Sequence, residues 1–170
     1  MKRLFVLLLL ATGCAHGVPV PGYEARVIGA SPSETARVMD IFVRRSPELF
    51  DIGPERVRNL ISRCTVSYTT GVVAPSGDPG LVVTGITREV YYVTVLRNAE
   101  HTGPGDDALV HELVHVVLWA AYGNPEPGHA RRWTPATDAW IQSVMDEYTR
   151  SSHATPNEHE RNTLGLLPSP

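Results

Sequence analysis

Three residues in the segment 110–123 could hold and use a metal ion. His111, Glu112 and His115 form the pattern H-E-x-x-H. On an α-helix, side chains four residues apart lie one above the other, so His111 and His115 can reach a single ion. Glu112 is rotated by about 100° from His111, where its carboxylate can bond to a water near the ion but is poorly placed as a ligand. The spacing therefore predicts two metal ligands and one base.

These residue types are suited to hydrolysis. Neutral imidazole binds Zn²⁺ without cancelling its charge, and the ion lowers the pKa of its bound water to about 7. Glu112 would take a proton from that water as the water attacks a carbonyl carbon, and would pass the proton to the leaving amine. The motif therefore predicts a zinc-dependent peptidase. The alternative interpretation is a buried helix whose two histidines are merely hydrogen-bonded.

The residues around the motif are typical of one strong helix. A Gly/Pro-rich stop at residues 102–105 precedes it, and Asp106 and Asp107 occupy its first turn. Gly123 follows the apolar run and is placed as the residue that ends the helix in a left-handed conformation. The pattern predicts a helix that presents the histidines on one face.

A third ligand must come from beyond this helix, because a catalytic zinc usually has three protein ligands and one open position. The loop at residues 124–133 contains Pro and Gly residues that can turn the chain back across the helix. His129 lies in this loop, and we expect it to complete the site. Glu126, Asp138 and Glu147 remain alternative ligands, and a site with no third protein ligand is the remaining possibility.

A family resemblance appears when these residues are read together. The segment 111–123, followed by Gly128-His129 and Trp133, resembles the SprT-like (spartan-type) zincin metallopeptidases. Their sites read H-E-x-x-H, then a helix that often contains Trp, then G-H-G-x-x-W. Ala130 stands where the family commonly has Gly, and the resemblance covers about 25 of the 170 residues.

The resemblance implies both a site and a fold. His111, His115 and His129 would be the zinc ligands, and Glu112 would be the catalytic acid/base. The implied fold is a zincin-like α+β domain, with a small antiparallel or mixed sheet packed against the active-site helix and further helices. The resemblance does not extend to a substrate, because the rest of the chain has no counterpart in it.

The remaining elements are predicted from local signals. Ser31 caps a helix that runs to Arg45, Pro54 opens a second helix, and Thr134-Pro135 opens the last one. Strands are expected at residues 23–28, 64–68, 81–87 and 89–97, with an exposed loop at residues 71–80.

The strongest strand signal is at residues 89–97, just before the metal helix. We expect this strand either to line the cleft and pair with an extended substrate or to be a plain core strand.

The N-terminus predicts export. Lys2 and Arg3 precede an apolar run that is too short to span a bilayer permanently, so residues 1–13 are expected to be a signal peptide of the lipoprotein type. Cys14 follows Ala-Thr-Gly, which resembles a bacterial lipobox, and is the expected lipid attachment site in a cell envelope. Ordinary cleavage near Ala15 and an uncleaved anchor are the alternatives.

The expected domain organisation is simple. Residues 14–22 form a tether, residues 23–150 one metallopeptidase domain, and residues 151–170 a poorly ordered tail. Without Cys14 the only cysteine is Cys64, which lies among apolar residues and is expected to be a small buried hydrophobe. No disulfide is therefore expected.

The charge and composition of the chain exclude some classes of binding partner. Without Lys2 and Arg3 the 15 basic residues become 13, against 18 acids, so no footprint for nucleic acid or an anionic lipid surface is expected. A protein or peptide substrate, a membrane reached only through the lipid, and a Zn²⁺ cofactor are expected. The alternatives are a lipoprotein with a structural or inactive zinc site that serves as a binding module, and an amidase of cell-wall material.

The group that stabilises the transition-state oxygen is left open by the sequence. The candidates near the metal motif are His101, Tyr122, Arg131, Arg132 and Tyr148.

Overall fold

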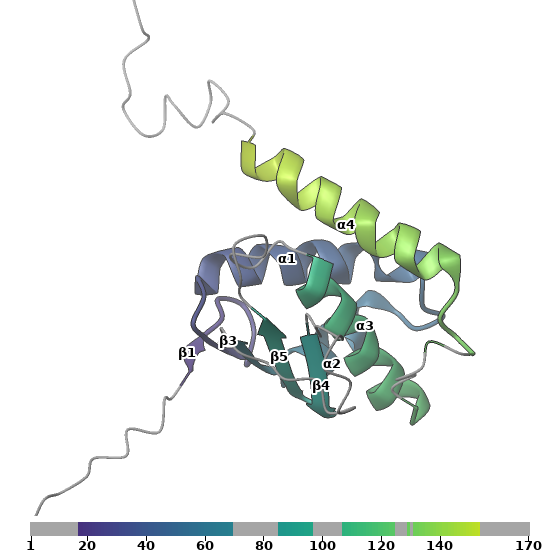
Figure 1. Cartoon of the computed structure of the whole chain (residues 1–170), viewed down its shortest axis with the longest axis horizontal. Helices are drawn as coiled ribbons and strands as arrows, with labels where there is room; N and C mark the ends of the chain where they lie inside the picture. Colours follow the sequence, from purple (N-terminus) through teal and green to yellow (C-terminus); the bar gives the residue numbers. More distant parts are fainter. Residues whose placement is uncertain (1–16, 70–84, 97–106, 125–128, 130, 154–170) are drawn as a thin grey trace, which may run out of the picture.

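The chain forms a mixed α+β domain in which helices pack on one sheet (Figure 1). The computed structural model describes residues 17–69, 85–96, 107–124, 129 and 131–153. The expected α+β class and the mixed character of the sheet are confirmed. Within this described part, no helix is long and apolar enough to cross a membrane.

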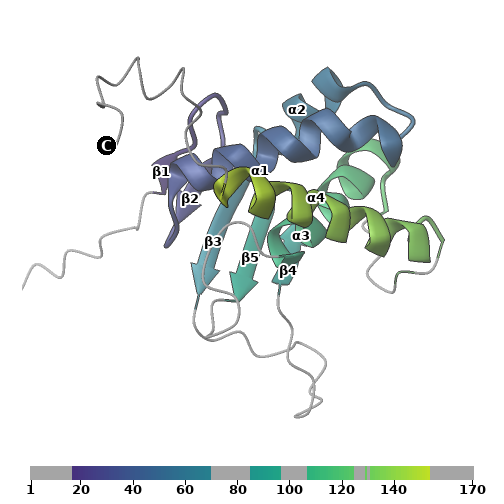
Figure 2. The same cartoon turned by 90° about the horizontal axis from the view of Figure 1, so that it is seen from above.

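The sheet has five strands in the order β1-β2-β3-β5-β4. The pairs β2·β3 and β3·β5 are parallel, whereas β1·β2 and β4·β5 are antiparallel. Figure 2 shows β3, β5 and β4 side by side. The strand bounds are Val18–Pro19 (β1), Arg26–Ile28 (β2), Thr65–Thr69 (β3), Gly85–Glu89 (β4) and Tyr92–Leu96 (β5).

One face of the sheet forms the floor of the core. Val27, Val66 and Val93 are neighbours across three strands and are each at most 1% exposed. The alternate positions Ser67 and Thr94 point the other way and are partly exposed. This apolar and polar alternation fixes the register, because a slip by one residue would turn the valines away from the helices.

Helix α1 (Pro32–Arg45) begins where its capping signal predicts. The Ser31 side chain accepts a hydrogen bond from the Glu34 backbone N–H at 3.4 Å, and Pro32 occupies the first helical position. Met39 and Phe42 lie on its buried face and are fully buried. A 3-10 turn, η1 (Ser46–Glu48), follows the helix.

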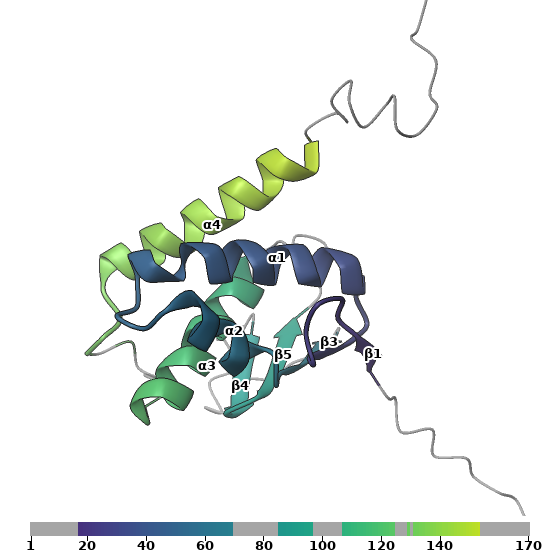
Figure 3. The same cartoon turned by 180° about the vertical axis from the view of Figure 1, so that it is seen from behind.

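The other helices surround the helix that carries His111 and His115. Helix α2 (Pro54–Ile61) begins at Pro54, and α3 (Asp107–Tyr122) packs on β4, β5 and α2. Helix α4 (Pro135–His153) packs on α1 and α3. Figures 1 and 3 place α4 beyond α1, on the side away from the sheet. Helix α3 is therefore held between the edge of the sheet and an outer helix.

The prediction that the strand at residues 89–97 lines the cleft as a free edge is wrong. Strand β5 lies between β3 and β4, so both of its edges are paired, and the terminal strand beside α3 is β4. Strand β5 is the plain core strand that the alternative interpretation expected, because Val93 and Val95 face the core. The chain reverses at residues 90–91 between the two strands.

The ordered domain begins before the predicted boundary at residue 23. Val18 and Pro19 pair with β2, and Val20 is 1% exposed, so only the first part of the predicted tether precedes the fold. At the other end α4 continues through His153, three residues beyond the predicted end of the domain at residue 150. The signal segment, Cys14, the loop at residues 71–80 and the tail from residue 154 lie outside the described residues.

Candidate metal centre

Helix α3 and the loop that follows it bring three histidines together. His111 and His115 lie on one face of α3, four residues apart. The helix ends at Gly123, which has a φ of 74° and donates its backbone N–H to the Trp119 carbonyl oxygen at 2.9 Å. This is the left-handed helix end that the sequence predicts, and it starts the loop that returns to His129.

The imidazole nitrogens of the three histidines converge. His115 Nε2 lies 3.2 Å from His111 Nε2 and 3.2 Å from His129 Nε2. All three donor atoms lie within 4.8 Å of one another. His115 is buried, His111 is half-buried and His129 is exposed, so the cluster opens to solvent on one side.

These distances fit a metal better than they fit hydrogen bonding. A neutral imidazole nitrogen either donates or accepts a single hydrogen bond, so His115 Nε2 cannot satisfy both neighbours in that way. Three nitrogens bound to one tetrahedral zinc at about 2.0–2.1 Å would lie roughly 3.3 Å apart. The observed separations of 3.2 Å are close to that value. The cluster can therefore hold a metal ion through three imidazoles.

The backbone of His129 supports the same conclusion. Its φ is 51°, and among the described residues it is the only non-glycine with a positive φ. An L-residue in this region costs about 1–2 kcal/mol, and such strain gathers at functional sites. The strained conformation is what places the His129 imidazole beside the two histidines of α3.

The protonation of the cluster also suits a metal. Burial, followed by the nearby imidazoles of His115 and His129, lowers the pKa of His111 to about 4. His111 is therefore neutral at neutral pH, which is the form that binds zinc. Glu112 is 4% exposed and lies on α3 directly after His111. A buried carboxylate thus stands next to the candidate ligands.

Trp133 supports the histidines from one side. Its ring centroid lies 4.5 Å from that of His111, 4.7 Å from that of His115 and 4.1 Å from that of His129. The indole Nε1 donates a hydrogen bond to Asp138 Oδ1 at 2.8 Å, which holds the ring against the first turn of α4. Sequence reasoning placed Trp133 in the motif but missed Asp138 as its anchor, because the pair spans a helix start.

The rival third ligands are placed elsewhere. Asp138 is bonded to Trp133 and is not part of the histidine cluster. Glu147 pairs with Arg44 and Arg45 of α1 and is not part of the histidine cluster. Glu126 lies outside the described residues. Among the described candidates, only His129 joins His111 and His115.

The residues considered for stabilising a transition-state oxygen lie in different parts of the fold. The Tyr122 hydroxyl donates to Asp51, and its ring lies under the Arg132 guanidinium. Tyr148 packs beneath Arg37 between α4 and α1. Arg131 is exposed, and His101 lies outside the described residues.

Among the described residues, Cys64 does not belong to the histidine cluster. It is 1% exposed, and burial raises the pKa of its thiol to about 12. The prediction of a small buried hydrophobe is confirmed.

No protein-family model, curated protein or solved structure matches this chain. The three clustered histidines and their surroundings are therefore the basis for any assignment of function.

Proposed function

We propose that this chain is a zinc-dependent metallopeptidase with a zincin-like fold of the SprT-like type. The observation that carries the proposal is the convergence of His111, His115 and His129, with a buried Glu112 next to the first of them. Zn²⁺ bound there would activate a water molecule and polarise the carbonyl group that the water attacks.

The donor set favours a catalytic over a structural ion. Structural zinc sites usually have four protein ligands, whereas catalytic sites have three and an open position. Within the described part of the chain the cluster has three donors, all of them imidazoles. Three neutral ligands also leave the full charge of the ion available for water and substrate.

Glu112 has the position of a general base. It follows His111 by one residue, so its carboxylate leaves the helix about 100° away from that ligand. In this role it takes a proton from the attacking water and delivers it to the leaving amine. Glu112 is 4% exposed, so its carboxylate lies beside the histidines in a site with little bulk water.

The edge strand β4 supports a peptide substrate. It is the last strand in the sheet order, it packs against α3, and no described strand pairs with its outer edge. An extended peptide could add to this edge by backbone hydrogen bonding and so lie along the metal helix.

Two variants of Glu112 test the proposal with a disordered protein such as β-casein as substrate. Glu112→Ala and Glu112→Gln should retain one zinc per chain, because Glu112 is not a ligand, and should lose turnover by several orders of magnitude. Wild-type turnover in either variant would refute the general-base role. A wild-type protein that binds zinc but cleaves no unfolded protein would refute the peptidase assignment, and cleavage of purified peptidoglycan in its place would favour the cell-wall amidase.

We further propose that the protein is exported and anchored through a lipid on Cys14, as the sequence of residues 1–14 indicates. A Cys14→Ser variant should move from the membrane fraction to the soluble fraction of the cell envelope. Retention of the variant in the membrane fraction would contradict the lipid anchor.

A further inference from the structure

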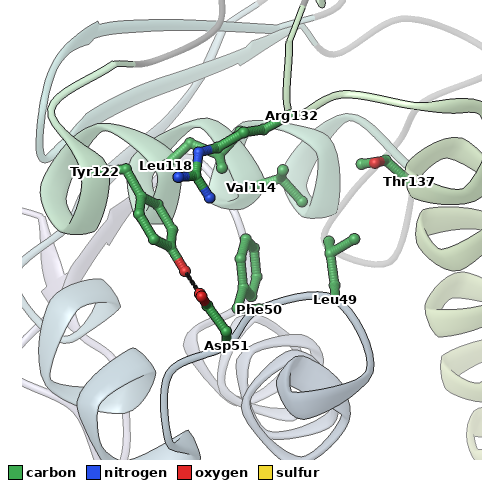
Figure 4. Close-up of a pocket in the computed structure, with 8 residues that line it drawn as sticks. All are labelled: Leu49, Phe50, Asp51, Val114, Leu118, Tyr122, Arg132 and Thr137. Atoms are coloured by element: carbon green, nitrogen blue, oxygen red, sulfur yellow. Dashed lines mark hydrogen bonds between the residues drawn. The ribbon is translucent and has the colours of Figure 1, made fainter.

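A hollow lies between α3, the segment after η1 and the start of α4 (Figure 4). Its volume is about 200 Å³. Four apolar side chains line most of it, namely Leu49, Phe50, Val114 and Leu118. Phe50 is 6% exposed and Val114 is 1% exposed, so these walls are part of the core and are rigidly held.

The hollow runs along the histidine face of α3. Val114 follows His111 by three residues, and Leu118 follows His115 by three residues. Side chains at this spacing are neighbours on a helix, with Cβ atoms about 5–6 Å apart. The segment before α4 contributes to both features. Arg132 lines the pocket, and the next residue, Trp133, lies against all three histidines. The pocket and the metal centre are therefore adjacent.

One end of the hollow is polar. Tyr122 donates its hydroxyl hydrogen to Asp51, and the Arg132 guanidinium carbon lies 4.0 Å from the centre of the Tyr122 ring. Figure 4 shows the guanidinium over the ring, whereas Asp51 meets the hydroxyl end. Arg132 forms no salt bridge in the described part of the chain, and its charge adds to the Tyr122 hydrogen bond in lowering the pKa of the Asp51 carboxyl.

This arrangement selects a class of ligand. A guanidinium with free N–H groups binds a carboxylate through two parallel hydrogen bonds, and stacking on an aromatic ring preorganises it. A hollow of about 200 Å³ is smaller than the usual range for drug-sized ligands, and it suits one amino-acid side chain rather than an acyl chain.

We propose that this pocket binds the C-terminal residue of a peptide, with an apolar side chain in the hollow and the α-carboxylate on Arg132. The inference rests on the proposed function in one respect, since it makes peptides with apolar C-terminal residues the substrate class. Binding itself needs neither the metal nor turnover. A peptide held in this way presents a bond near its C-terminus to the metal centre.

N-acetyl-L-leucine is a direct probe, and N-acetyl-L-leucinamide is its matched control without a carboxylate. The acid should bind with a dissociation constant on the order of 1 mM, which is typical for a ligand of this size. The amide should bind at least about ten-fold more weakly, since it cannot accept both guanidinium bonds as an anion. NMR titration of the purified wild-type protein and of its Glu112→Ala variant measures both constants without hydrolysis.

Arg132→Gln should abolish the preference for the acid, whereas Arg150→Gln, which removes the same charge at an exposed position on α4, should preserve it. Because Arg132 is exposed, its variant should keep the wild-type melting temperature. Equal affinity of wild-type protein for acid and amide, or an unchanged preference in Arg132→Gln, would overturn the inference even if the protein hydrolyses peptides. A retained preference in a protein without peptidase activity would support the pocket and refute the proposed function.

Discussion

The indole of Trp133 lies parallel to the imidazole of His129, with ring centroids 4.1 Å apart and planes 16° apart. The same indole is hydrogen-bonded to Asp138 at the start of α4. The ring that lies against His129 is thus held by a residue outside α3. Residues that orient metal ligands in this way commonly change affinity when they are altered.

Asp138→Ala should therefore weaken zinc binding by about 10-fold, because Trp133 loses its anchor and the His129 ring gains freedom. Competition with a chromophoric chelator measures the affinity. Asp146→Ala is the matched control, since Asp146 is also exposed on α4 and accepts a side-chain hydrogen bond, from Gln142. Equal zinc affinities in the two variants would show that the Trp133–Asp138 bond has no role at the metal.

A comparison of His129→Gly with His129→Ala distinguishes the cost of backbone strain at residue 129 from the loss of a metal ligand. Glycine tolerates the φ of 51°, so the metal-free variant should be about 1 kcal/mol more stable than His129→Ala, which keeps a Cβ at that backbone position. Both variants should lose tight zinc binding. Denaturant unfolding of the two metal-free proteins measures the difference, and equal stabilities would contradict a strained backbone at His129.

The junction between β2 and β3 can be tested at Gly29. Its φ is 81°, and a Cβ there would lie 2.9 Å from the Tyr68 carbonyl oxygen, whereas Gly22 has a φ of 76° and open space around it. Gly22→Ala should lower the free energy of unfolding by about 1 kcal/mol, because of backbone strain alone. Gly29→Ala should lower the free energy of unfolding by at least about 2 kcal/mol, because a steric clash with β3 adds to the backbone strain. Similar unfolding free energies in the two variants would contradict this close approach.

Cys64 predicts a pH dependence of stability. Burial raises the pKa of its thiol from 9.0 to about 12, so the folded chain keeps a proton that the unfolded chain loses above pH 9. The contribution of this group is fully present below pH 9 and falls as the pH rises from 9 to 12. In a Cys14→Ser background, Cys64→Ala should lose stability less steeply over this range. Parallel stability curves for the two proteins would contradict the buried thiol.

Much of this organisation is predictable from sequence because its signals are local. Ser31, Pro54 and Gly123 mark helix ends through backbone hydrogen bonding and restricted φ values that act within a few residues. The histidine pair follows from helix periodicity. His129 could be expected because it lies in a short Pro/Gly loop directly after the metal helix.

What could not be predicted depends on contacts between distant segments. Strands β4 and β5 have similar apolar character, and only packing against α3 and β3 decides which of them forms the edge. The hydrogen bond between Asp51 and Tyr122 joins residues 71 positions apart and has no local signature. The pocket that it helps to form was therefore missed.

The most direct test of the central claim is the zinc content of the purified protein and of three single variants. After equilibration with Zn²⁺ at neutral pH, the wild-type protein and a His153→Ala control should each contain one zinc per chain. His115→Ala and His129→Ala should bind zinc at least about 100-fold more weakly, because each removes one of three converging nitrogens. A wild-type protein without zinc, or a His129→Ala protein with wild-type affinity, would contradict the three-histidine centre.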